Sequence, residues 1–163
     1  MLQTERSFTL DADALQVAYK RLMAEAHPDR HGQASPEQQQ RVADHASDIT
    51  DAYAILKSPH TRATHLLELL GAPLNEDTSG GILGPDFLMH VMEVREELEE
   101  AGTEVERLQA LRSANRETVA ELLEQLGVAF AASSGLDEAR ALTARLQYLQ
   151  RIEEEIHARM PVE

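Results

Sequence analysis

The sequence predicts an all-α protein, built as a helical hairpin followed by a three-helix bundle. Aromatic residues are only 4% of the 163 residues and tryptophan is absent, so the core must be built from Leu, Val, Ile, Ala and Met. Glycine is scarce, whereas Ala, Leu, Glu, Gln and Arg, which have high helix propensity, are abundant. Apolar residues also recur at three- and four-residue spacing, which is the period of an amphipathic helix.

The first long helix is predicted to begin after Asp11, a suitable N-cap, and to end near Ala26. Pro28 stops it, because proline lacks a backbone N–H and disfavours helical geometry in the preceding residue. His27 is therefore expected at the helix end and Asp29 in the following loop. The face expected to be buried contains Ala14, Leu15, Ala18, Leu22 and Ala26.

A second helix is predicted from Pro36 to about Lys57. Ser35 is a good N-cap, Pro36 occupies the first helical position, and Gln38 completes a capping box. The apolar positions of this helix are Val42, Ala46, Ile49, Tyr53 and Leu56. The two apolar stripes can pack antiparallel, which gives a hairpin with a short polar loop at its tip.

A shorter helix is predicted from Pro59 to Gly71, where glycine ends it. Residues 72–84 are rich in Pro, Asn, Asp, Thr, Ser and Gly, and are predicted to be a linker. Three further helices are expected at about 85–101, 103–131 and 136–158. The stripe that indicates a bundle lies in the last of them and contains Leu142, Leu146, Leu149, Ile152 and Ile156.

Charge and composition exclude several classes of function. The formal net charge is −14. Residues 1–57 carry 6 Lys+Arg and 9 Asp+Glu (−3), and residues 58–163 carry 9 and 20 (−11), which argues against nucleic acid as a partner. Without cysteine there are no disulfides, thiolate zinc sites or cysteine nucleophiles. No apolar run is long enough to span a bilayer and the N-terminus does not look like a signal, so a cytoplasmic protein is expected.

The helix expected at 85–101 has two different faces at about 100° per residue. One arc, assigned to the bundle core, contains Phe87, Val91, Val94, Leu98 and Ala101. The opposite side contains Met89, Met92, Glu93, Glu96 and Glu100, with Leu88 on the flank. This side is a docking face with an apolar centre and an acidic rim in one interpretation. In the other, the methionines pack under a neighbouring helix or under the first domain, and the glutamates form a solvated face. Periodicity leaves both open.

The tripeptide His27-Pro28-Asp29 lies between two amphipathic helices and has Lys20, Arg21 and Arg30 around it. This arrangement resembles the J domain, which stimulates ATP hydrolysis by DnaK-type chaperones. The alternative is that Pro28 and Asp29 only turn the chain.

Two longer segments make the resemblance more specific. They are Leu56-x-x-Pro59-x-x-Arg62-Ala63-x-x-Leu66-Leu67, and Phe87-Leu88-Met89 followed by Arg95-Glu96-Glu97-Leu98. Together with the tripeptide they are similar to HscB, the J-domain co-chaperone of iron–sulfur cluster assembly, from about Leu10 to Ile156. The resemblance implies a J domain at 1–71, a linker at 72–84 and a scaffold-binding bundle at 85–163.

The resemblance also implies partners and site residues, with no enzymatic activity, cofactor or metal of the chain's own. The residues expected to engage an HscA/DnaK-type ATPase are His27, Pro28, Asp29, Lys20, Arg21 and Arg30. The residues expected to bind an IscU-type scaffold are Leu88, Met89, Met92, Glu93, Glu96, Glu100 and Tyr148. Tyr148 lies off the buried stripe of the last helix, so it could join the same surface.

The chain departs from the family at its start, because most of the family's short aromatic-rich first helix is absent. We expect this to expose part of the hairpin's apolar face. Eukaryotic relatives add a cysteine-bearing zinc segment, which this chain lacks.

Two competing functions remain. A general J-domain co-chaperone delivering unfolded clients to DnaK lacks support from a Gly/Phe-rich or zinc-binding region. A metal enzyme using His27, His31 and Asp29 is disfavoured, because Pro28 breaks the helix that would align the histidines.

Overall fold

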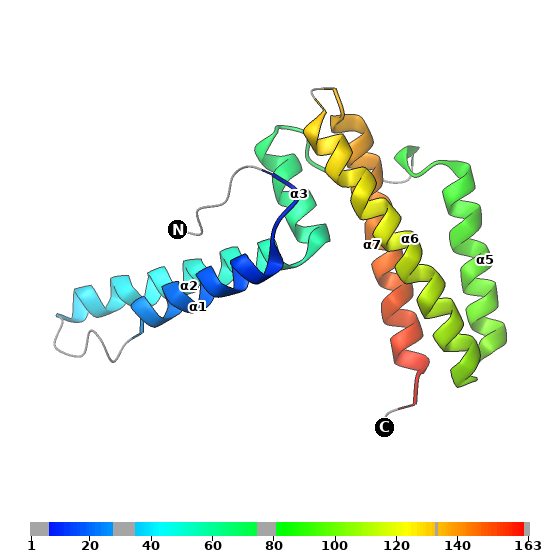
Figure 1. Cartoon of the computed structure of the whole chain (residues 1–163), viewed down its shortest axis with the longest axis horizontal. Helices are drawn as coiled ribbons and strands as arrows, with labels where there is room; N and C mark the ends of the chain where they lie inside the picture. The colour runs from blue at the N-terminus through cyan, green and yellow to red at the C-terminus, as the bar shows by residue number, and fades with distance from the viewer. Residues whose placement is uncertain (1–6, 28–34, 75–80, 133, 162–163) are drawn as a thin grey trace. The chain divides into compact units, whose positions relative to one another are not determined.

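A computed structural model describes residues 7–27, 35–74, 81–132 and 134–161, and within these ranges the chain contains helices and no strand. The predicted all-α class is therefore confirmed. The helices are α1 (Ala12–Glu25), α2 (Pro36–Lys57), α3 (Pro59–Leu69), α5 (Pro85–Ala101), α6 (Val105–Ala131) and α7 (Leu136–Arg159) (Figure 1). The chain divides into two compact units, Met1–Leu66 and Leu67–Glu163. None of the described helices is long and apolar enough to cross a lipid bilayer.

Both helices of the N-terminal hairpin begin at the predicted caps. The Asp11 carboxylate accepts hydrogen bonds of 3.0 Å from the backbone N–H groups of Asp13 and Ala14. Ser35 and Gln38 form the predicted capping box, in which each side chain accepts from the other residue's backbone N–H. These bonds satisfy N–H groups that have no partner within the helix, which fixes where α1 and α2 start.

The packing of α1 against α2 buries the centre of the predicted stripes and leaves most of their other members half-buried (Figure 1). Leu22, Ala26 and Ile49 form the centre of this small core. Tyr19 and Tyr53 stack across the two helices, with ring centroids 4.1 Å apart and planes 15° from parallel. The prediction was wrong for Ala14, which is exposed. Ala14 lies about 100° around the helix from buried Leu15, so it falls outside the face toward α2.

The link between α2 and α3 is fixed by side chains of the Leu56–Leu67 motif. The Thr61 hydroxyl donates a hydrogen bond to the Ile55 carbonyl at 2.7 Å, and the Arg62 guanidinium donates one to the Leu56 carbonyl. The Arg62 guanidinium also lies over the Phe8 ring, 5.0 Å from its centroid. Burial lowers the pKa of Arg62. The Leu56 carbonyl and the Phe8 ring take the place of part of the water that the guanidinium loses on burial.

The second unit contains a three-helix bundle of α5, α6 and α7, in which both other helices pack on α7. The predicted stripe of α7 is fully buried, with every member at most 1% exposed: Leu142, Leu146, Leu149, Ile152 and Ile156. Asn115 of α6 is also buried, and its side-chain amide donates to the Leu149 carbonyl at 3.1 Å. Leu83, assigned by composition to the linker, is fully buried, and its carbonyl accepts a 3.1 Å bond from Arg145.

Two arginines of α6 converge on one carboxylate of α7. Glu153 accepts from Arg112 at 2.7 Å and from Arg116 at 3.0 Å, all on the same oxygen. Burial alone would raise the pKa of Glu153, but the hydrogen bonds and charges of the two arginines outweigh it and lower the pKa below its ordinary value. The carboxylate form is therefore stabilised by folding.

This pairing predicts a pH dependence of stability. A carboxyl whose pKa is lower in the folded state adds stability above its unfolded-state pKa, and that stability is lost as the pH falls through the folded-state pKa. Glu153→Gln is thus expected to lower the free energy of unfolding by about 1 kcal/mol at pH 7, and much less at pH 3. Urea unfolding of the full chain across this range measures the difference. Glu154→Gln, at the exposed neighbouring position, is the control and should show little pH-dependent difference.

Candidate functional site

The outer face of α5 exposes an apolar cluster. Leu88, Met89 and Met92 are 38%, 60% and 62% exposed, and all three belong to the first two turns of the helix. Val91 and Leu98, on the opposite side, are at most 3% exposed. Within the bundle, the methionines therefore do not pack under α6 or α7, and their place on a docking face stays a prediction. Phe87 and Val94, expected in the core, are half-buried at its edge.

Carboxylates border this cluster on the C-terminal side. Glu93, Glu96 and Glu100 are all exposed, as predicted. Glu100 is engaged within the bundle, since Arg107 donates to its backbone carbonyl at 3.0 Å and pairs with its carboxylate at 3.4 Å. No comparable ion pair involves Glu93 or Glu96 in the described part of the chain. These two carboxylates therefore place negative charge beside the apolar cluster.

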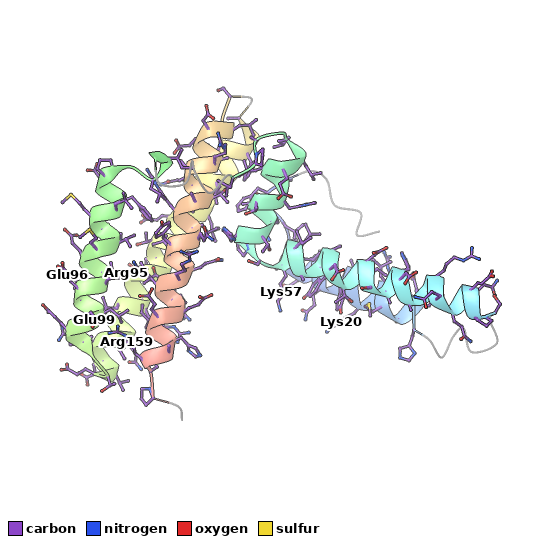
Figure 2. The ribbon with its side chains drawn as sticks, turned by 180° about the vertical axis from the view of Figure 1, so that it is seen from behind. Lys20, Lys57, Arg95, Glu96, Glu99 and Arg159 are labelled. Carbon is purple, nitrogen blue, oxygen red and sulfur yellow. The ribbon has the colours of Figure 1, made fainter. Side chains whose placement is uncertain are left out.

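The other side of α5 is attached to α7 by arginines, which orients the outer face. Arg95 pairs with Glu155 at 3.0 Å. Arg159 donates to the Leu98 carbonyl at 2.6 Å and also binds the Glu99 carboxylate. Figure 2 shows Arg95 and Arg159 between the two helices and Glu96 on the outer side of α5. Sequence reasoning missed these contacts, although one signal was present: Arg159 is one of two basic residues in the last turn of α7.

Tyr148 of α7 lies beside the N-terminal end of α5. Its ring meets that of Phe87 edge to face, with centroids 6.3 Å apart and planes at 90°. The Arg151 guanidinium lies 5.7 Å from the Tyr148 ring centroid. Tyr148 is half-buried, so it is anchored against α5 and still partly accessible. Its membership of the same surface as the apolar cluster stays a prediction.

At the hairpin tip, the structure places some of the predicted residues. His27 is exposed directly after the end of α1, and Lys20 and Arg21 are exposed on α1 itself. Figure 2 shows Lys20 along the hairpin. Pro28, Asp29 and Arg30 lie outside the described residues. His31 also lies outside them, so the metal-enzyme interpretation is not tested at the tip. Elsewhere in the described chain no group of three His, Asp or Glu side chains could hold a metal ion.

Comparison with known proteins places this architecture in a family. Residues 83–157 match the family described as the HSCB C-terminal oligomerisation domain. The chain is 35% identical to the co-chaperone protein HscB homolog of Burkholderia multivorans over 94% of its length and 87% of that protein.

Solved structures agree. Chaperone HscB from Vibrio cholerae matches with a TM-score of 0.82 at 30% identity, covering 96% of this chain and 93% of that one. Human co-chaperone protein HscB matches with a TM-score of 0.88 at 29% identity, covering 96% and 78%. The likeness extends through both compact units, so the protein belongs to the HscB family of co-chaperones.

Proposed function

We propose that this co-chaperone serves iron–sulfur cluster assembly by joining two proteins. The His27-Pro28-Asp29 tip stimulates ATP hydrolysis by an HscA/DnaK-type chaperone. The outer face of α5, with Tyr148, holds an IscU-type scaffold. The observation that carries the proposal is the exposed methionine cluster with its carboxylate border, in a chain of this family.

The composition of the face favours one kind of partner. An exposed apolar centre with a charged border is the usual arrangement of a recognition surface. Here the border is negative, so the matching surface has an apolar centre and basic residues beside it. Methionine side chains adapt to the partner's shape, and Glu93 and Glu96 increase the association rate at low salt.

The tip acts on the chaperone through charge. Asp29 would accept a charge-assisted hydrogen bond from an arginine of the ATPase, which is stronger than a bond between neutral groups. His27 and Pro28 would set the shape of the loop. Lys20, Arg21 and Arg30 would attract an acidic surface, although the protein as a whole is strongly acidic.

Both sites belong to one chain, and this coupling is the mechanism. A scaffold bound to the bundle is presented to the chaperone at a raised effective concentration. ATP hydrolysis, triggered at the tip, would then trap the scaffold on the chaperone and promote release of its cluster. The protein itself performs no covalent step in this scheme.

The double substitution Met92→Ala and Glu96→Ala tests the scaffold face. It removes an exposed apolar anchor and a bordering charge one helical turn apart, so the scaffold Kd should rise at least about tenfold. Stimulation of the ATPase without scaffold should not change, because the tip is untouched. Isothermal titration calorimetry with the purified scaffold measures the first effect, and a single-turnover ATP hydrolysis assay the second.

A matched control is available on α6. Glu124→Ala with Val128→Ala removes the same kinds of side chain at the same spacing, and Val128 is 71% exposed. This control should bind the scaffold normally. If the α5 double variant and the α6 double variant bind the scaffold with equal affinity, the assignment of the α5 face is contradicted. Binding of many extended peptides in place of one folded scaffold would instead support a general co-chaperone.

A further inference from the structure

The described methionines fall into two groups. Met89 and Met92 are 60% and 62% exposed on α5. Met23 and Met160 are half-buried, and each sulfur has a polar hydrogen nearby: the Thr50 hydroxyl lies 3.8 Å from the Met23 sulfur, and Arg112 Nη1 lies 3.8 Å from the Met160 sulfur. The two accessible thioethers therefore lie together on the face assigned to the scaffold. Figure 2 shows sulfur on the outer side of α5, away from the rest of the bundle.

Met89 and Met92 also act as a unit. They are three residues apart on one helix, so their side chains are neighbours on its surface. Leu88 extends the apolar area, whereas Glu93 and Glu96 contribute only acceptor oxygens. Neither Leu88 nor these two carboxylates can donate a hydrogen bond to a modified sulfur. Arg95, three residues after Met92, is paired with Glu155 at 3.0 Å.

We propose that Met89 and Met92 are a reversible oxidation site through which peroxide releases the scaffold. The sulfur lone pair attacks one peroxide oxygen, forming an S–O bond while the O–O bond breaks and a proton moves to the departing oxygen. Methionine loses two electrons and becomes the sulfoxide, and hydrogen peroxide is reduced to water. A methionine sulfoxide reductase reverses the step with a dithiol, which becomes a disulfide as the oxygen leaves in water.

The consequence for binding follows from polarity. A sulfoxide is a strong acceptor, and burying it without a donor costs the hydration it had in water. Two sulfoxides would stand at the centre of the interface, where the methionines make apolar contact. The Kd for the scaffold should therefore rise at least about tenfold. Cluster delivery would stop under peroxide stress and resume after reduction.

The first measurement needs no partner. The full chain is treated with hydrogen peroxide, quenched with catalase at intervals and mapped by tandem mass spectrometry. Met89 and Met92 should be oxidised several times faster than Met23 and Met160. Equal or faster oxidation of Met23 or Met160 would overturn the proposal. Circular dichroism should show unchanged helix content at the point where Met89 and Met92 are oxidised, and unfolding there would also overturn it.

The second measurement rests on the proposed function and uses the purified scaffold. Peroxide-treated protein should bind at least about tenfold more weakly than untreated protein, and sulfoxide reductase should restore the affinity. The Met89→Leu, Met92→Leu variant should show the same affinity before and after peroxide, each compared with its own untreated sample. The Met23→Leu, Met160→Leu variant should keep the full peroxide response.

The two hypotheses fail in different ways. If untreated protein binds the scaffold normally and complete oxidation of Met89 and Met92 does not change the Kd, the switch alone is overturned. No binding by untreated protein would overturn the scaffold assignment and the switch together.

Discussion

Asp29→Asn is expected to reduce stimulation of the chaperone ATPase close to the unstimulated rate. The amide has nearly the size of the carboxylate and similar turn preferences, but it lacks the charge that strengthens a hydrogen bond to arginine. A hydrogen bond to a charged group contributes about 1.5–3 kcal/mol, so the loss should be about tenfold to a hundredfold. Scaffold binding and the free energy of unfolding should stay near their original values.

Single-turnover ATP hydrolysis by the chaperone, with and without the variant, measures this effect. Asp48→Asn is the matched control, since Asp48 is an exposed aspartate on α2 away from the tip. The control should stimulate normally. Full stimulation by Asp29→Asn would show that the tripeptide only turns the chain.

Gly135→Ala is expected to destabilise the bundle by about 2–4 kcal/mol. A Cβ atom at this position would overlap the Ala129 carbonyl oxygen and lie 2.9 Å from the carbonyl carbon. Both are backbone atoms, so no side-chain rotation can relieve the overlap. The turn between α6 and α7 would have to move, and with it the start of α7, where the Gly135 carbonyl accepts the first helical bond from Ala139 at 2.8 Å.

Urea unfolding followed by circular dichroism measures this loss. Gly81→Ala is the control, because nothing lies within 4 Å of its added Cβ. That variant should be as stable as the original protein or slightly more stable, since alanine restricts the unfolded chain. Equal stability of Gly135→Ala and the original protein would show that the α6–α7 turn can adjust.

Most helix boundaries could be predicted because they depend on neighbouring residues. Asp11 and the Ser35–Gln38 capping box act within three or four positions, and Gly71 ends its helix with a positive φ of 74°. The buried stripe of α7 was also predicted, since a single helix period determines which side chains share a face. The same reasoning placed Met89 and Met92 opposite Val91 and Leu98.

The sequence by itself therefore determined the all-α class, the hairpin, the bundle and the two faces of α5. Only the tertiary structure decided that the methionines are uncovered within the bundle, that Ala14 is exposed, and that Leu83 belongs to the bundle core. It also decided which partners Arg95, Arg112 and Arg159 bind. The reason is physical: caps and periodicity are set by residues a few positions apart, whereas burial and ion pairing depend on helices that meet only after the chain has folded.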